Sequence, residues 1–169
     1  IMNIAIVGAT GNVGRKTLEV IEKKGLLINN LYLLASSKSV GKKINFKKKE
    51  YEILDLEKFD FSKVKIAFFA AGGKISEKYA EKVSKHCFVI DNSSFYRMNP
   101  DVPLVVPQVN AGDLNHIKKN IIANPNCSTA QLVIVLKPLH DLFSIKRIVV
   151  STYQSVSGAG KASMDELIE

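Results

Sequence analysis

The 169-residue sequence has no tryptophan, only two cysteines, and no apolar run long enough to cross a bilayer. A membrane-spanning helix needs about 20 consecutive apolar residues, so no segment is a candidate for one. Cys87 and Cys127 have neither the number nor the spacing of a disulfide framework or a zinc site, and we expect no bound metal. The beginning of the chain also lacks the cationic and apolar segments of a secretory signal peptide. Together these absences favour a cytoplasmic protein without a membrane partner.

Acidic residues are scarce as well, since 16 Asp and Glu stand against 24 Lys and Arg, which gives a formal net charge of +8. Much of the excess lies in Lys42, Lys43 and the run at residues 47–49. A basic run can bind nucleic acid, but no aromatic residues for stacking on bases accompany this one, and such runs are more often solvated faces. We therefore expect no nucleic-acid partner. A basic surface equally suits an enzyme with phosphorylated or carboxylated ligands, because it attracts anions.

The residues that are abundant indicate a soluble α/β domain. Hydrophobic residues make up 46% of the chain and charged residues 24%, as in ordinary globular proteins. Short apolar runs alternate with amphipathic helical patterns, and this order predicts a parallel, doubly wound sheet of the Rossmann type. Cys87 begins one of the apolar runs and is interpreted as a core residue. The expected strands span residues 3–7, 31–35, 51–54, 65–70 and 87–91.

A glycine-rich turn follows the first expected strand. Its sequence is Gly8-Ala9-Thr10-Gly11-Asn12-Val13-Gly14, and a helical pattern with Leu18 and Ile21 on one face comes next. Without Cβ atoms, the backbone at the start of that helix can approach a pyrophosphate closely. The spacing is Gly-x-x-Gly-x-x-Gly rather than the commoner Gly-x-Gly-x-x-Gly, and the alternative is a tight turn without a ligand. Because the turn lies between a strand and a helix, we favour dinucleotide binding.

The end of the second expected strand carries hydroxyl groups and a cation. An NAD-preferring site usually has an acidic residue at this point, which holds the ribose 2′-hydroxyl. This chain has Ser36-Ser37-Lys38-Ser39 instead, a sequence that suits the 2′-phosphate of NADP. We therefore expect NADP as the cofactor, and the alternative is a polar loop with an incidental lysine.

The alternation of strands and helices stops between residues 92 and 110. A loop of this length in a compact domain is usually functional. Arg97 is the one cation in its polar stretch, residues 92–101. The planar fork of a guanidinium group suits phosphate or carboxylate, and the alternative is an ordinary surface arginine.

A cysteine marks the start of the next helical pattern. Asn124-Pro125-Asn126 ends a short apolar run, and the helical pattern extends from Ser128 to Leu142. Asn126 is a favourable N-cap residue, so Cys127 is expected at the helix N-terminus, where free N–H groups and the helix dipole favour a thiolate. A thiolate beside backbone donors combines a nucleophile with an oxyanion site. The alternative is a small buried hydrophobic residue, as most free cysteines are.

The last part of the chain is rich in β-branched residues. Residues 145–156 are expected to form a strand, in which Gln154 alternates with apolar neighbours and could point into a site. A glutamine there can orient or polarise a ligand, but it is no base at neutral pH. The small-residue turn Ser157-Gly158-Ala159-Gly160 could close over a cofactor, and a helix-like segment reaches Glu169.

Four motifs, taken together, resemble the aspartate-semialdehyde dehydrogenase family. They are the glycine turn, the segment from Asp91-Asn92-Ser93-Ser94 through Arg97 to Pro107, the segment Asn124-Pro125-Asn126-Cys127-Ser128-Thr129, and the segment from Ser151 to Gly160. They occur in the family's order and cover essentially the whole chain. The resemblance implies an NADP-binding domain at residues 1–126 and the beginning of an α+β catalytic and dimerisation domain at residues 127–169.

The reaction that the resemblance implies is the reductive dephosphorylation of L-aspartyl-4-phosphate to L-aspartate-4-semialdehyde through a cysteine thioester. NADPH is the reductant in this direction, and phosphate is released. The reaction is an early step towards diaminopimelate and lysine, methionine and threonine. The resemblance also implies that the full-length protein forms a homodimer or a dimer of dimers.

Matched residue by residue, the resemblance assigns roles to the candidate side chains. Cys127 would be the catalytic nucleophile, Arg97 would bind the substrate phosphate, Gln154 would bind and orient the substrate, and Asn126 would line the pocket. Lys38 stands where the family commonly has arginine, so it keeps the charge but loses the bidentate fork. The residues expected to contact NADP are Gly8, Thr10, Gly11, Asn12, Val13, Lys38, Ser39, Ser157 and Gly158.

Two parts of the family's site have no counterpart in the sequence, namely the acid–base histidine and the arginine that grips the substrate's α-carboxylate. His86, His116 and His140 match no catalytic motif. We therefore expect a truncated chain that binds NADP but does not turn over. The alternatives are the related N-acetyl-γ-glutamyl-phosphate reductase, which an assay with both acyl phosphates would reveal, and a catalytically silent NADP-binding module, in which Cys127 would react as slowly as a free thiol.

Overall fold

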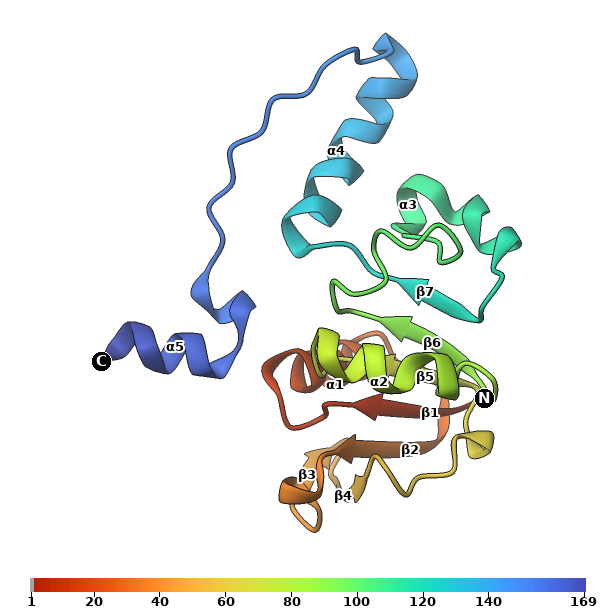
Figure 1. Cartoon of the computed structure of the whole chain (residues 1–169), viewed down its shortest axis with the longest axis vertical. Helices are drawn as coiled ribbons and strands as arrows, with labels where there is room; N and C mark the ends of the chain where they lie inside the picture. The colour runs from red at the N-terminus through yellow and green to blue at the C-terminus, as the bar shows by residue number, and fades with distance from the viewer. Residues whose placement is uncertain (1) are drawn as a thin grey trace.

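The computed structural model describes residues 2–169 and contains a seven-stranded, mostly parallel sheet (Figure 1). The strand order is β3-β4-β2-β1-β5-β6-β7, and β3 and β4 form an antiparallel hairpin at one edge. The parallel, doubly wound sheet expected from the sequence is confirmed, and it contains the five strands expected between residues 3 and 91. The strands are β1 (Met2–Val7), β2 (Ile28–Ala35), β3 (Lys43–Phe46), β4 (Lys49–Asp55), β5 (Ile66–Phe69), β6 (Phe88–Asp91) and β7 (Ile121–Ala123).

Alternate residues of each strand point to opposite faces of the sheet, and helices cover both faces. Ile6 of β1 packs in an apolar cluster with Leu18 of α1 (Asn12–Lys23). Its neighbour Ala5 packs in a second cluster with Ala80 of α2 (Gly73–Val83). The two clusters are the core, and they fix α1 and α2 on opposite faces. Cys87 lies in the second cluster with 7% of its surface exposed, which confirms it as a core residue.

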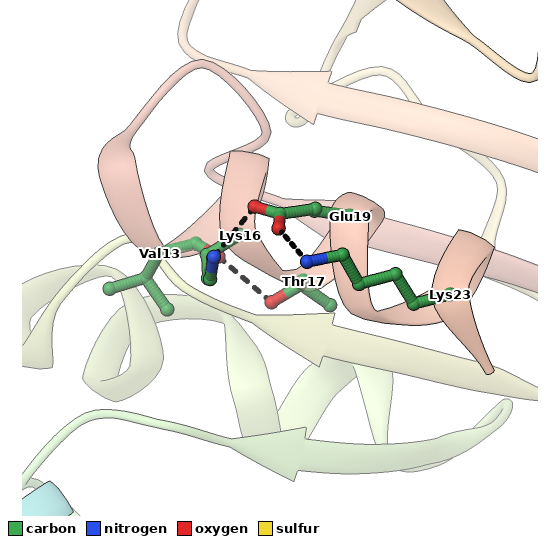
Figure 2. Close-up of polar contacts among 5 residues, drawn as sticks. All are labelled: Val13, Lys16, Thr17, Glu19 and Lys23. Carbon is green, nitrogen blue, oxygen red and sulfur yellow. Dashed lines mark hydrogen bonds and ion pairs between the residues drawn. The ribbon is translucent and has the colours of Figure 1, made fainter.

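The outer face of α1 carries a ladder of charged side chains. Figure 2 shows the carboxylate of Glu19 between Lys16 and Lys23, with 2.7 Å from oxygen to nitrogen in both pairs. The Thr17 hydroxyl donates to the carbonyl of Val13 at 2.9 Å. Exposed pairs of this kind contribute little to stability, so burial of its apolar face is what holds α1 in place.

Three further α-helices follow β6, namely α3 (Pro107–Asn110), α4 (Cys127–Phe143) and α5 (Lys161–Ile168). A long, extended segment joins α4 to α5 and runs alongside the rest of the chain (Figure 1). No helix among residues 2–169 is long and apolar enough to span a membrane. Short 3₁₀ helices lie between the other elements along the chain: η1 (Ser37–Ser39), η2 (Phe61–Lys63), η3 (Ala111–His116) and η4 (Val156–Ala159).

The expectation of a strand at residues 145–156 is wrong. Residues 144–155 have neither helix nor strand, and η4 begins at Val156. The β-branched side chains of the segment are exposed, with 78% of Val149 and all of Tyr153 accessible. A strand needs a neighbour to receive its backbone hydrogen bonds, and no described strand pairs with this segment.

Candidate functional site

The glycine turn packs against the ends of the two strands that flank β1. The amide of Gly8 donates to the carbonyl of Leu34 in β2 at 2.8 Å, and Gly8 itself has a φ of 85°. A Cβ atom added there would lie 2.7 Å from the carbonyl oxygen of Ala70, at the end of β5. A Cβ at Gly14, inside α1, would collide with the carbonyl oxygen of Gly8. Glycine at both positions thus lets the start of α1 come close to the carboxyl edge of the sheet.

The first turn of α1 has no side-chain cap. Gly11 occupies the N-cap position, and no hydrogen bond from a side chain reaches the free N–H groups of the turn. The turn contains no acidic residue either. Its N–H groups and the positive end of the helix dipole are therefore available to an anion.

A cavity of about 990 Å³ opens over this turn and extends along the carboxyl edge of the sheet. β1 lies between β2 and β5, so the cavity is at the point where the strand order reverses and where open α/β sheets bind their ligands. Its lining includes Val7 at the end of β1 and the turn residues Gly8, Thr10, Gly11, Asn12 and Val13, then Ala35, Ser36 and Ser37 at and after the end of β2, Ala70 and Ala71 after β5, and Arg97, Asn126, Ser157, Gly158 and Gly160 from later in the chain.

Arg97 is half-buried on this cavity and is held by two backbone carbonyls. Its Nε donates to Asn124 at 3.0 Å and its Nη2 donates to Asn92 at 3.3 Å. A guanidinium group has five N–H bonds, so three are left to bind an anion in the cavity. The backbone clamp sets the direction of the fork before any ligand arrives.

The loop that carries Arg97 is anchored by a fully buried carboxylate. Asp91, the last residue of β6, accepts hydrogen bonds from the hydroxyl groups of Ser76 at 2.6 Å and Ser93 at 2.8 Å, and from the amide of Ser93 at 3.0 Å. Its backbone carbonyl accepts from the amide of Asn124 at 2.8 Å. Asp91 therefore joins the Arg97 loop to the segment that leads into α4. The sequence reasoning quoted Asp91 only as part of a motif and missed this anchoring role.

Cys127 is the first residue of α4, as expected from its position after Asn126. The Asn126 side chain caps the helix by accepting from the amide of Ser128 at 2.9 Å. The Cys127 side chain is exposed, so the alternative of a buried hydrophobic residue is wrong. Its sulfur lies 3.9 Å from Oδ1 of Asn126.

A second cavity of about 630 Å³ lies over Cys127 and adjoins the first. Ser157 and Gly158 line both cavities, so the small-residue turn forms a shared wall. Gln154 also lines the second cavity, and its Oε1 accepts from Nδ2 of Asn126 at 3.1 Å. Asn126, which lines the first cavity, thus connects it to the side chain of Gln154 and to the cysteine.

The structure brings most of the candidate residues to these two cavities. The exceptions are Lys38 and Ser39, which lie on η1 and are absent from the described lining, whereas the neighbouring Ser36 and Ser37 line the first cavity. Residues that the sequence reasoning missed line the same end of the cavity, and they come from the turn after β4 and from α2. They are Leu56, Glu57, Ile75, Lys78 and Tyr79.

No group of three or more His, Cys, Asp or Glu side chains among the described residues is arranged to hold a metal ion. His86, His116 and His140 line neither cavity. The reactive side chains gathered at the two cavities are therefore the thiol of Cys127, the guanidinium of Arg97, the ammonium of Lys78 and the carboxylate of Glu57.

Comparisons with known proteins agree with this geometry. Residues 3–117 match the family described as semialdehyde dehydrogenase, NAD binding domain, and residues 136–169 match semialdehyde dehydrogenase, dimerisation domain. The aspartate-semialdehyde dehydrogenase of Rickettsia bellii is 51% identical over 169 residues, which are 99% of this chain and 50% of that protein. The chain spans about half the length of the curated relatives that it matches.

Two solved structures show how far the likeness extends in space. The aspartate semialdehyde dehydrogenase II of Vibrio cholerae, complexed with ASA, superposes with a TM-score of 0.91 at 49% identity, over 99% of this chain and 50% of that one. The aspartate semialdehyde dehydrogenase of Candida albicans, with NADP, gives a TM-score of 0.65 at 27% identity, over 86% of this chain and 48% of that one. Because the Vibrio cholerae match covers 99% of this chain, it includes the glycine turn, the Arg97 loop and the start of α4 together.

Proposed function

The chain belongs to the semialdehyde dehydrogenase family, and from this premise we propose that the protein is an NADP-dependent aspartate-semialdehyde dehydrogenase. The main support for the proposal is that the first and second cavities share a wall formed by Ser157 and Gly158. This chemistry requires a dinucleotide site next to a reactive cysteine. The similarity of the chain to aspartate-semialdehyde dehydrogenases supports the choice of aspartyl phosphate and aspartate semialdehyde as substrates. We propose a boundary between the two domains at residues 126 and 127.

The first cavity has the features that a dinucleotide phosphate needs. The uncapped first turn of α1 offers N–H groups, and Gly8 and Gly14 leave room where any side chain would collide. Gly8, Thr10, Gly11, Asn12 and Val13 would hold the pyrophosphate, with Ser157 and Gly158 closing from the opposite side. Ser36 and Ser37 would lie nearest the 2′-phosphate, with Lys38 and Ser39 beside them on η1. When bound, the dinucleotide supplies the hydride for reduction.

Cys127 would provide the nucleophile for the acyl transfer. Its sulfur would attack the acyl carbon of aspartyl phosphate, so that the S–C bond forms, the C–O bond to phosphate breaks, and phosphate leaves with the electron pair. Arg97, with three free N–H bonds, would neutralise the charge that develops on the departing phosphate. Because the acyl group stays on the sulfur, it is kept in place while phosphate leaves and reduction follows.

Asn126 and Gln154 would orient the reacting groups. Asn126 fixes the start of α4 through its cap and holds the amide of Gln154 at 3.1 Å. Neither side chain can take up a proton at neutral pH, so both would position the substrate and neither would act as a base.

Two further features bear on the cellular location and the oligomeric state of the full protein. A thiol that must stay reduced suits the cytoplasm, where disulfides are rare, and we propose that location. α4 leaves large apolar side chains exposed, with 74% of Leu142 and 75% of Phe143 accessible, and both lie among the residues that match a dimerisation domain. We therefore propose a homodimer or a dimer of dimers, built on this part of the chain.

The experiment that tests the substrate is acylation of Cys127. The protein is mixed with L-aspartyl-4-phosphate, and the intact mass shows whether one acyl group has been added. We expect one adduct on the wild-type chain and none on C127S. N-acetyl-γ-glutamyl phosphate in place of aspartyl phosphate is the specificity control. A faster reaction with this second acyl phosphate would overturn the proposed substrate.

A further inference from the structure

The cavity end that lies beyond β2 contains an acidic side chain. Glu57 lines the cavity together with Ser36 and Ser37, and it follows Leu56, whose amide donates to the carbonyl of Ala35 at 3.0 Å. The carboxylate therefore comes from the turn after β4, the strand next to β2, at the same edge of the sheet. In a dinucleotide bound with its pyrophosphate on the glycine turn, this end takes the adenosine ribose and base.

Glu57 is not a free carboxylate. The ammonium of Lys78 lies 2.9 Å from its Oε1, and the Tyr79 hydroxyl donates to the same oxygen. Lys78 also lies 4.8 Å from the centre of the Tyr79 ring. The hydrogen bonds from Tyr79 and Lys78 hold the pKa of Glu57 below its usual range, so the group is ionised at neutral pH. Its own amide donates to the side chain of Asp55 at 2.9 Å, which fixes the start of the turn.

An unpaired carboxylate here would favour the wrong cofactor. A carboxylate near the adenosine ribose accepts hydrogen bonds from the 2′-hydroxyl of NAD and repels the 2′-phosphate of NADP. In this pocket an ammonium cancels the charge of Glu57, and Lys78 keeps further N–H bonds, since an ammonium group has three. Lys78 lines the cavity, whereas Lys38, the cation expected from sequence to meet the 2′-phosphate, is absent from the described lining.

We propose that Lys78 shields the 2′-phosphate of NADP from the carboxylate of Glu57 and thereby sets the preference of the pocket for NADP over NAD. This inference rests on the proposed cofactor. It assigns the discrimination between NADP and NAD to α2 and the turn after β4, in addition to the serines that follow β2. Lys78 acts through the charge of Glu57, so the two residues form one specificity-determining pair.

The test is a set of four chains titrated with NADP and with NAD by calorimetry. K78M leaves Glu57 without its cationic partner, and we expect the affinity for NADP to fall roughly tenfold relative to that for NAD, the size of one charge interaction at a solvent-exposed surface. The double variant E57Q/K78M removes the repelling charge as well, and it should regain most of the lost preference. K74M is the matched control, because Lys74 is an exposed lysine of the same helix that is absent from the described lining.

The results separate this inference from the function on which it rests. If the wild-type chain binds neither cofactor, the proposed dinucleotide function is wrong. If it binds NADP and K78M keeps the same NADP-to-NAD ratio, only the role of Lys78 is wrong. A double variant as weak for NADP as K78M would also overturn the shielding by Lys78. Both side chains are more than half exposed, so the variants should fold, and thermal unfolding of each chain checks this.

Discussion

Nε of Arg97 donates a hydrogen bond to the backbone carbonyl of Asn124 at 3.0 Å. The bond joins two loops that follow neighbouring strands, since Arg97 comes after β6 and Asn124 after β7. Asn124 is only three residues before Cys127. The same short backbone segment therefore positions both the guanidinium group of Arg97 and the cysteine. This arrangement explains how a phosphate site and a nucleophile on different loops keep one geometry.

The first prediction concerns the anion-binding role of Arg97. In R97A, acylation of Cys127 by aspartyl phosphate should slow roughly 100-fold, because the departing phosphate loses its charged partner. The rate is measured from intact masses over time. Iodoacetamide, which is uncharged, should alkylate Cys127 of R97A at the wild-type rate. An equal loss with both reagents would mean that the substitution disturbs α4 and that Arg97 does not act on phosphate.

The two cysteines should differ sharply in reactivity. Cys127 is exposed at the start of α4, whereas burial raises the pKa of the Cys87 thiol to about 11. At pH 7.5 iodoacetamide should therefore modify Cys127 alone, and peptide mapping by mass spectrometry identifies the site. C127S should take up no label under the same conditions. Label on Cys87 in the native protein would contradict the packing of the second core cluster.

The raised pKa of Cys87 also predicts a loss of stability in alkaline solution. The folded protein holds the thiol proton more tightly than the unfolded chain does, whose cysteine titrates near pH 9. The contribution of the protonated Cys87 thiol to the free energy of unfolding is therefore complete below about pH 9. As the pH rises towards 11, the free energy of unfolding falls by about 2 kcal/mol. Urea unfolding of wild type and C87A at pH 8 and pH 10.5 measures it. The free-energy gap between the two proteins should shrink at the higher pH, and a constant gap would contradict the prediction.

Gly14 should be the glycine that tolerates substitution least well among those with ordinary backbone angles. A Cβ there would collide with the carbonyl oxygen of Gly8, so G14A must push α1 away from the sheet. We expect a loss of about 2 kcal/mol in unfolding free energy, as for overpacking in a core, together with weaker NADP binding. G112A is the matched control, since a Cβ at Gly112 meets no atom within 4 Å. Urea unfolding of both variants, with calorimetry for NADP, would show the contrast.

The sequence was most informative where the signal is local. The glycine turn and the N-cap at Asn126 are each encoded within a few residues, and the structure has both where they were expected. The exposed, unpaired segment at residues 144–155 shows the limit of this reasoning. β-branched composition predicts a strand, but a strand forms only beside another one, and composition does not say whether that neighbour is there.

The strand at residues 51–54 was expected, but β3 and its pairing with β4 were missed for a related reason. The tight turn between β3 and β4 consists of Lys47 and Lys48, whose φ angles are 48° and 61°, in positions where glycine or asparagine is the usual signal. A run of lysines is more typical of a solvated face than of a hairpin turn, so the sequence carries no clear signal for this strand pairing. Lys78 was missed because nothing in its helical pattern shows which exposed lysine turns towards a cavity. Such placement depends on how α2 packs on the sheet, which is a tertiary property.

The last prediction is that this chain binds NADP without catalysing turnover. Reduction of a thioester needs a proton donor for the oxygen and, in reverse, a base for the attacking group. None of the three histidines lines either cavity, and neither Asn126 nor Gln154 exchanges protons at neutral pH. Loss of NADPH absorbance at 340 nm in the presence of aspartyl phosphate should therefore not exceed the rate of a C127S control, although the wild-type chain is acylated. Reduction faster than that control would contradict the prediction, because it would mean that another group supplies the proton.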